Sequence, residues 1–349
     1  MKRSVSLSPF VLAFLFCLIA VSASAATQRV IIDTDPGVDD AMAILLALNS
    51  PELKVEALTV VPGNIEGKQG LENALKIVSL AGRCDVLVAG GAEHPLNQKL
   101  ITAQYWHGPN GLAGVELPAS KCKADPRFGP DLIIELVHKY PHEISLIPVG
   151  PLTNIALAVS KDPSIVPLVK DVVIMGGSIT GGNVNGAAEA NIYNDPDAAA
   201  IVFNAGWMVT MIGSDVGERT IITRKHLAEL QASHGPESDF VYKLADFYVT
   251  RSEKSGYQGA AMYDPLAVAT VVDASLVTLK DMHVDVETKG EFTRGETVAN
   301  RMGYDEKNVL HGDHYEIDGL EELKSNSRVC LASDADRFLR LFVNRIKGK

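Results

Sequence analysis

The chain has 349 residues, a formal net charge of −11 at pH 7 and an apolar fraction of 46%. Acidic residues outnumber basic ones and there is no basic run or patch, so nucleic acid is excluded as an expected partner. The length suits one large α/β domain or two small ones, and the sequence contains no linker that would separate two.

The N-terminus has the pattern of a secretory signal peptide over residues 1–25. Lys2 and Arg3 precede an apolar run from Pro9 to Val21, and the small residues Ala23-Ser24-Ala25 follow as a cleavage site. This run is too short to favour the alternative of an uncleaved membrane anchor. No later apolar stretch reaches the length of a bilayer span, so we expect an exported protein, periplasmic or extracellular, with one domain over residues 26–349.

The expected mature chain has an odd number of cysteines. Cys84, Cys122 and Cys330 remain after processing, and their spacing is not that of a metal site. In an oxidising compartment they allow one disulfide, but they do not form a disulfide scaffold. Loss of Lys2 and Arg3 would change the formal charge from −11 to −13.

Apolar, β-rich runs alternate with helical patterns along most of the chain. The predicted strands are Arg29–Asp33, Val55–Val61, Asp85–Ala89, Ile144–Val149, Val172–Met175 and Met208–Ile212. The predicted helices are Asp40–Leu48, Gly67–Leu80, Leu132–Lys139, Asn154–Val159 and Pro196–Asn204. Strands that are nearly continuous in apolar residues are typical of a parallel sheet covered on both faces, so the alternation predicts a doubly wound, mostly parallel, Rossmann-like open sheet. Short alternating runs from Thr278 to Asn300 predict a small antiparallel hairpin near the C-terminus.

Loops rich in Gly, Pro, Asn or Asp follow several of the predicted strands. They read DTDPGVDD from Asp33, PGN from Pro62, GG from Gly90, GPLTN from Gly150 and MGGS from Met175. In open α/β sheets, ligands bind in the crevice beyond the carboxyl ends of the strands. We therefore expect the polar residues of these distant loops to converge.

The first of these loops holds four aspartates: Asp33, Asp35, Asp39 and Asp40. A strand end, a turn and a helix N-terminus explain one or two of them, because a helix N-terminus tolerates negative charge. They do not explain all four. Several carboxylates that converge on one point need a cation, and an all-oxygen ligand set favours Ca²⁺ or Mg²⁺ over zinc.

Five motifs in order resemble the inosine–uridine-preferring nucleoside hydrolase family. They are DTDPGVDDA, PGN, GPLTNIA, the GGN…EANIYNDPDAA loop and YDPLAV, and RGETV near Arg294 is similar to the family's C-terminal part. The resemblance covers nearly all of the expected mature chain. It implies a Ca²⁺-dependent enzyme of nucleoside catabolism that hydrolyses the N-glycosidic bond of ribonucleosides to free base and ribose. A homo-oligomer, dimer or tetramer, is also expected.

The resemblance also implies a set of metal ligands. Asp35 and Asp40 would hold the ion, together with the backbone carbonyl of Thr153 and the carboxylate of Asp264. Asp35 would act as general base and take a proton from the metal-bound water, which is the nucleophile. Asp33 would orient its neighbours. Two of these residues have simpler explanations, since Thr153 could cap a helix and Asp264, before Pro265, could begin one.

On the sugar, the resemblance implies that Asp39 and Asn64 bind two adjacent hydroxyls. Asn183, Glu189 and Asn191 would hold the rest of the ribose. These three lie in a Gly-rich loop in which Asn is common for turn reasons, so their assignment depends on the resemblance rather than on spacing. The cluster of acids also has a catalytic use. Departure of the base leaves a sugar with positive character, which carboxylates stabilise in the transition state.

On the base side this sequence departs from the family pattern. Tyr263 stands where better known members have a His before the metal-binding Asp, and Ala190 stands where an aromatic residue often occurs. Tyr263 could donate a hydrogen bond or stack, but with an ordinary pKa near 10 it is a poor acid at neutral pH. Trp106 could stack on a purine and His107 could protonate a ring nitrogen. The alternative for His107 is a structural role. These residues predict a preference for purine ribosides.

Three other functions are compatible with parts of the sequence. A haloacid-dehalogenase-type phosphotransferase also begins with DxD after a strand, but it normally has Thr or Val where this chain has Gly37, and it leaves GPLTN unexplained. An exported nucleoside-binding protein without catalysis would fit the signal peptide and Tyr263. A hydrolase of a modified riboside would keep the chemistry and change the substrate.

Overall fold

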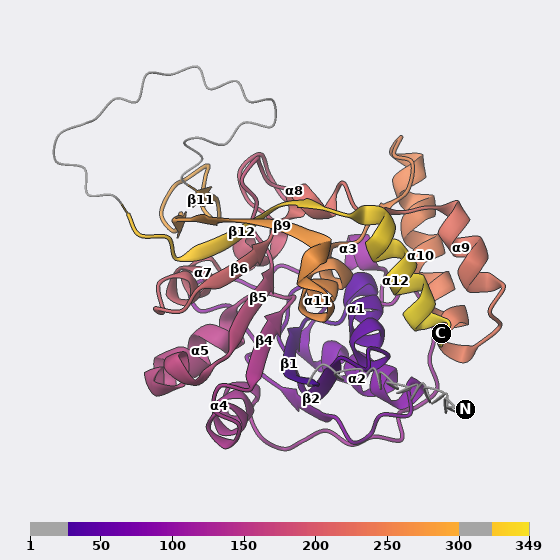
Figure 1. The fold of residues 1–349 in the computed structure, drawn as a ribbon, viewed down its shortest axis with the longest axis horizontal. Coiled ribbons are helices and arrows are strands. Elements are labelled where there is room, and N and C mark those ends of the chain that lie inside the picture. The colour runs from indigo at the N-terminus through magenta and orange to yellow at the C-terminus, as the bar shows by residue number, and fades with distance from the viewer. Residues whose placement is uncertain (1–26, 300–322, 349) are drawn as a thin grey trace, which may run out of the picture.

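The computed structural model describes residues 27–299 and 323–348 as a central sheet with helices on both faces (Figure 1). The predicted signal peptide lies outside the described residues. Eight strands form the sheet in the order β3-β2-β1-β4-β5-β6-β12-β9. Their bounds are β1 Gln28–Thr34, β2 Leu53–Val60, β3 Leu87–Gly90, β4 Ile144–Pro148, β5 Asp171–Met175, β6 Val209–Ile212, β9 Val277–Met282 and β12 Ser327–Ser333.

The first six strands confirm the predicted doubly wound sheet. Every pairing among β1 to β6 is parallel, and their order is the 3-2-1-4-5-6 of two βαβαβ halves. Every residue of β4, and all but the outermost residues of β1 and β5, are buried, as expected for strands covered on both faces. The strand order reverses between β1 and β4. The loops after these two strands therefore flank the crevice in which such sheets bind ligands.

The C-terminal part has the predicted antiparallel addition, with one more antiparallel strand than the single hairpin expected over residues 278–300. β9 joins the main sheet and pairs antiparallel with β12, whereas β10 (Val284–Val286) and β11 (Thr297–Ala299) form a separate two-stranded sheet. β12 itself continues the parallel sheet beside β6. The β10–β11 pair confirms the predicted antiparallel hairpin, but β9, in the same stretch, pairs instead with β12, which lies some 45 residues further along the chain and beyond the reach of a local pattern. A third small sheet pairs β7 (Ile221–Ile222) with β8 (Ala260–Ala261).

Two groups of helices cover the sheet and bury one apolar cluster on each face. One face carries α1 (Val38–Leu48), α2 (Gly67–Leu80), α9 (Arg224–Gln231), α10 (Pro236–Lys254), α11 (Tyr263–Val272) and α12 (Ala335–Ile346). The other carries α4 (Gly129–Lys139), α5 (Thr153–Lys161) and α7 (Pro196–Phe203). Shorter helices are α3 (Gln104–His107), α6 (Ala190–Asn194) and α8 (Ser214–Gly217), with 3₁₀ turns at Pro163–Leu168 and Ala274–Leu276.

Helix α1 is the central helix of the fold. All of its residues are buried, which agrees with a sequence that is apolar on every side after its first turn. It packs against both α10 and α11, and Figure 1 shows it beside α11. Because α1 and α11 lie side by side, the acidic first turns of the two helices can approach each other.

A long excursion, residues 91–128, connects β3 to α4 and contains only α3 as regular helix. A disulfide between Cys84 and Cys122 (Cα–Cα 5.0 Å) ties its end to the turn before β3, and a β-bridge joins Ala89 to Asp125. Cys330 is buried and unpaired. The one disulfide that the sequence allows is thus formed. Among the helices of the described residues, none has the length and apolarity to cross a bilayer.

Candidate functional site

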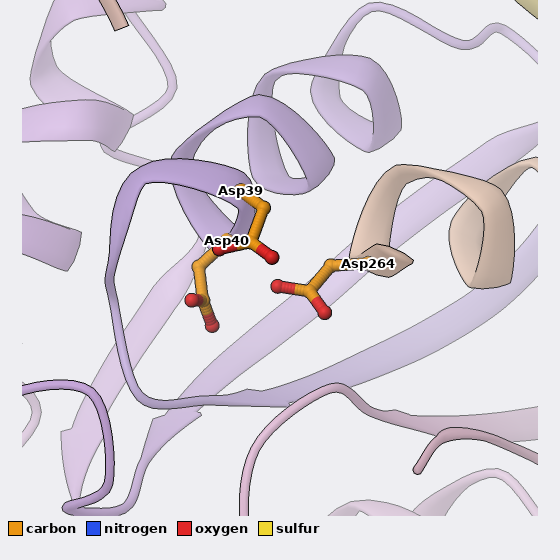
Figure 2. A group of neighbouring side chains, drawn as sticks. All are labelled: Asp39, Asp40 and Asp264. Atoms are coloured by element: carbon orange, nitrogen blue, oxygen red, sulfur yellow. The ribbon is translucent and has the colours of Figure 1, made fainter. Parts of the chain in front are cut away.

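Three carboxylates from two helix N-termini meet in one buried space. Asp39 and Asp40 lie in the first turn of α1, and Asp264 lies in the first turn of α11. Each offers an oxygen atom within 4.8 Å of the other two, and none is more than 6% exposed. Figure 2 shows Asp39 and Asp264 pointing toward each other, with Asp40 beside them. The first polar loop thus meets the first turn of α11 in one buried space.

Asp40 is held on both carboxylate oxygens. Oδ1 accepts hydrogen bonds from the Thr34 hydroxyl at 2.6 Å and from the backbone amide of Asp35 at 3.2 Å. Oδ2 accepts from the backbone amide of Gly37 at 3.0 Å and from the Asn64 side-chain amide at 2.9 Å. The turn after β1 and the loop after β2 thus fix the Asp40 carboxylate without a hydrogen bond from a positively charged side chain.

Asp35 follows β1 and has one oxygen without a partner. Its Oδ2 accepts a 2.6 Å hydrogen bond from the Asn64 backbone amide, whereas Oδ1 is buried and has no hydrogen-bond partner among the described residues. Two glycines make room for this carboxylate. A Cβ on Gly150 would lie 2.7 Å from Oδ1, and a Cβ on Gly63 would overlap Oδ2. An orphaned carboxylate oxygen in a close-fitting buried space is a candidate metal ligand.

The electrostatics of this cluster is unfavourable without a cation. Burial raises the pKa of Asp35, Asp40 and Asp264 above the ordinary value, and the neighbouring aspartates raise them further. Burial also raises the pKa of Asp39 to about 6. A set of hard oxygen donors with an unused lone pair fits a divalent cation that prefers oxygen ligands. The residues present therefore suit the metal dependence that the sequence predicts.

Asp33 supports the neighbouring loops rather than the cluster. Its Oδ1 accepts hydrogen bonds from the Thr59 hydroxyl and from the Asn154 side-chain amide, the latter at 2.8 Å, and burial raises the pKa of Asp33 to about 7. Asn154 stands beside Thr153 at the start of α5, and the Thr153 hydroxyl donates to Asp195 at 2.7 Å. The Thr153 hydroxyl is thus used in a contact with Asp195. Only the backbone carbonyl of Thr153 is left for the predicted binding of the metal ion.

The loop residues expected to hold the ribose are organised by helix α6. Glu189 caps this helix, because its carboxylate accepts from the backbone amides of Asn191 and Ile192, and also from Gly177. Burial raises the pKa of Glu189 to about 7. The Asn191 amide donates to the backbone carbonyls at the ends of β4 and β5, at 2.8 and 3.0 Å. Asn183 Oδ1 accepts from the backbone amide of Ala190 at 2.9 Å. All three predicted residues thus lie at the carboxyl edge of the sheet.

His107 comes to the cluster from α3. Its Nδ1 accepts a 3.2 Å hydrogen bond from the Val38 backbone amide and lies 3.7 Å from Asp39 Oδ1. Burial lowers the pKa of His107 to about 4. At neutral pH the ring is neutral and keeps its proton on Nε2, so the geometry favours a hydrogen-bond donor over the cationic acid considered from the sequence.

Tyr248, on α10, is a site residue that the sequence did not reveal. Its hydroxyl lies 3.2 Å from Asp39 Oδ1, to which it can donate, and 2.8 Å from His107 Nδ1. Because the hydroxyl has one proton and Nδ1 carries none, Tyr248 donates to Asp39 or to His107 but not to both at once. In the sequence Tyr248 is one of several large apolar positions on an amphipathic helix, so its pattern indicates only core packing.

The two aromatic residues predicted for the base side are both partly buried. Tyr263 begins α11 next to Asp264, and its side chain interacts with that of Asn183. Burial raises the pKa of Tyr263, and nearby carboxylates raise it further. Its hydroxyl therefore stays protonated. Trp106 is half-buried in α3, its ring is 6.1 Å from that of Tyr248, and the Arg251 guanidinium lies 4.9 Å above its ring centre. One face of Trp106 is thus already occupied by a cation.

Comparisons with known proteins agree on a single family. The model of the inosine-uridine preferring nucleoside hydrolases matches residues 30–340. An inosine-uridine preferring nucleoside hydrolase of Crithidia fasciculata is 41% identical over 276 residues, which are 78% of this chain and 88% of the relative. The pyrimidine-specific ribonucleoside hydrolase RihA of Photobacterium profundum is 39% identical over 79% of this chain and 89% of its own length.

Solved structures show the same likeness in three dimensions. A plant nucleoside hydrolase, PpNRh1, superposes with a TM-score of 0.82 at 35% identity, covering 92% of this chain and 99% of its own. A purine-preferring ribonucleoside hydrolase from Gardnerella vaginalis has the same TM-score at 37% identity, covering 92% of this chain and 98% of its own. The ordered motifs, the acidic cluster and these matches lead to one conclusion: the chain belongs to the inosine–uridine-preferring nucleoside hydrolase family.

Proposed function

We propose that this nucleoside hydrolase uses Ca²⁺ and cleaves ribonucleosides with Asp35 as general base. The observation that carries the proposal is the buried meeting of Asp39, Asp40 and Asp264 beside the unpartnered Oδ1 of Asp35. Asp35, Asp40, Asp264 and the Thr153 carbonyl would hold the ion. These are all oxygen donors, and without sulfur or imidazole ligands they favour Ca²⁺ over zinc or copper.

The chain's own residues supply the rest of the chemistry. When bound, the ion supplies a water of lowered pKa and positions for two sugar hydroxyls. Asp35 would also take a proton from the attacking water, the role that the family resemblance implies for it. Asp39, held by Tyr248, and Asn64 bind the adjacent hydroxyls of the ribose. As the base departs, the buried carboxylates stabilise the positive sugar more than they stabilise the neutral substrate.

Purine ribosides are the proposed preferred substrates. Trp106 offers an aromatic surface, and Tyr263 and neutral His107 each offer a hydrogen-bond donor, which a purine N7 can accept as the base leaves. The relatives divide on this point by name, since one is purine-preferring, one pyrimidine-specific and one prefers inosine and uridine. Base preference therefore has to be measured on this chain.

The test is turnover of the purified protein on a panel of purine and pyrimidine ribosides and their 2′-deoxy analogues. Chelation should abolish activity and Ca²⁺ should restore it more fully than Mg²⁺ or Zn²⁺. Ribosides should react much faster than deoxyribosides, because the 2′-hydroxyl is one of the groups bound by the ion and Asp39. Activity that survives exhaustive chelation, or equal rates on both sugars, would contradict the proposed site.

The protein is also proposed to be exported and to form a homo-oligomer. The Cys84–Cys122 disulfide supports an oxidising compartment, periplasmic or extracellular, in agreement with the predicted signal peptide. Secretion of the intact chain by its own leader, followed by N-terminal sequencing, should give a start near Ala26. The expected homo-oligomer, a dimer or tetramer, is tested by light scattering of the purified protein.

A further inference from the structure

Gly217 lies in contact with the ring of Tyr263. It is the last residue of α8, directly beyond the carboxyl end of β6, and it is buried. A Cβ built on Gly217 would overlap Tyr263 Cδ1 and would lie 3.0 Å from Cε1 and 3.3 Å from Cγ. All three nearest atoms belong to this one side chain. The space that glycine leaves free is therefore occupied by the Tyr263 ring and by nothing else so close.

The backbone does not need glycine at this position. Gly217 is helical and is not among the residues with positive φ, so alanine could adopt its conformation. A glycine inside a helix costs stability relative to alanine. The side chain of Tyr263 is thus the structural reason for a glycine here.

The two backbones are also locked to each other, so a larger residue could not push them apart cheaply. The segment after α8 pairs with the segment before α11, since Ile221 is opposite Ala261 in the β7–β8 sheet. The Met262 backbone amide donates to the Thr220 carbonyl at 2.9 Å. Both backbone segments are held in place within a few residues of the contact. The Tyr263 ring is therefore the part that would move.

We propose that Gly217 is a positioning residue that fixes the Tyr263 ring on the base side of the site, and that this pair helps to set base preference. The inference rests on the proposed function, in which Tyr263 stands at the leaving base. With its ring seated on α8, the Tyr263 hydroxyl is kept beside Asn183, from the loop that holds the ribose. Tyr263 replaces the family's usual His here, and Gly217 makes room for the ring in this position.

A double-mutant cycle tests the pair. Gly217→Ala in the wild type should displace the ring, lower kcat on inosine by roughly 10- to 100-fold and change the ratio of inosine to uridine turnover. In a Tyr263→Ala background the same substitution should change kcat by less than about twofold, because its clash partner is gone. Gly67→Ala is the matched control. Gly67 begins α2, and its Cβ would meet nothing closer than 3.8 Å.

The readouts separate positioning from a general loss of structure. Hydrolysis of nitrophenyl riboside, whose leaving group needs no help, should be nearly unchanged in Gly217→Ala, and so should the affinity for Ca²⁺. Equal losses in both backgrounds, or a loss of Ca²⁺ affinity, would overturn the proposal, because the effect would then act through α8 or Asp264. If Gly217→Ala is too unstable to assay, Tyr263→Ala is compared with the wild type instead. This variant must change the ratio of inosine to uridine turnover, and an unchanged ratio overturns the proposal. Chelation of the wild type tests the metal independently.

Discussion

Replacing Cys84 and Cys122 together by serine should lower the free energy of unfolding by about 4 kcal/mol. The bond joins positions 38 residues apart, and closing a loop of this length removes chain entropy from the unfolded state by about that amount at 25 °C. The disulfide fastens the end of the long excursion that carries α3, and with it His107 and Trp106. The bond therefore contributes to a segment with little secondary structure of its own.

Urea unfolding under oxidising conditions measures the difference between the wild type and the double serine variant. Reductant should bring the wild type to the midpoint of the variant and leave the variant unchanged. A difference below about 1 kcal/mol would refute the reasoning, since the loop would then be ordered in the unfolded state or strained in the folded one. Turnover at 25 °C should fall little, because the Ala89–Asp125 bridge and the Ser120 hydroxyl, which donates to the Leu75 carbonyl at 2.8 Å, still hold the loop.

Three further outcomes are expected. Asp40→Ala should weaken Ca²⁺ binding, measured by calorimetry, and lower turnover by orders of magnitude; unchanged affinity would remove Asp40 from the ligands. Asp35→Asn should stay inactive in excess Ca²⁺ while still binding it, and near-normal turnover would show that Asp35 is not the base. In metal-free protein the pKa values of the proposed ligands Asp35, Asp40 and Asp264 are raised, as is that of the neighbouring Asp39, to about 6; their protonation adds stability at low pH that is lost as the pH rises through these values, whereas Ca²⁺ needs the ionised carboxylates. The increase in melting temperature caused by Ca²⁺ should therefore grow from about pH 5 to pH 8, and a pH-independent increase would contradict this linkage.

The N-terminal half of the fold could be predicted because its signals are local. Each strand from β1 to β6 is an apolar run, and a helix lies between each strand and the next along the chain, which leaves few ways to assemble them. In the C-terminal part only the β10–β11 hairpin has such a signal. The partner of β9 is β12, separated from it in sequence by β10 and β11, so the pairing is fixed by the sheet edge left free beside β6 rather than by any local pattern.

Some residues of the candidate site also have a local signal in the sequence, and others do not. The acids of the first loop are dense enough in the sequence to require a cation, and the structure brings Asp39 and Asp40 to Asp264. Tyr248 and Gly217 give no comparable signal, because an aromatic residue in an apolar stripe and a glycine after a strand each have common structural explanations. Their roles depend on neighbours far away in the sequence. Only the packed fold shows that Tyr248 reaches Asp39 and that Gly217 makes room for Tyr263.

The same burial that destabilises the metal-free cluster is what makes the cluster useful in catalysis. Carboxylates in a site that excludes water act strongly on a charge placed among them, and they need no reorganisation when that charge develops. In the proposed site, a divalent cation would balance part of the negative charge of the resting enzyme. The remainder would act on the ribose, which becomes positive only as the base departs. A solvent-exposed set of four aspartates would cost the folded protein less, but it would also distinguish poorly between the neutral substrate and the transition state.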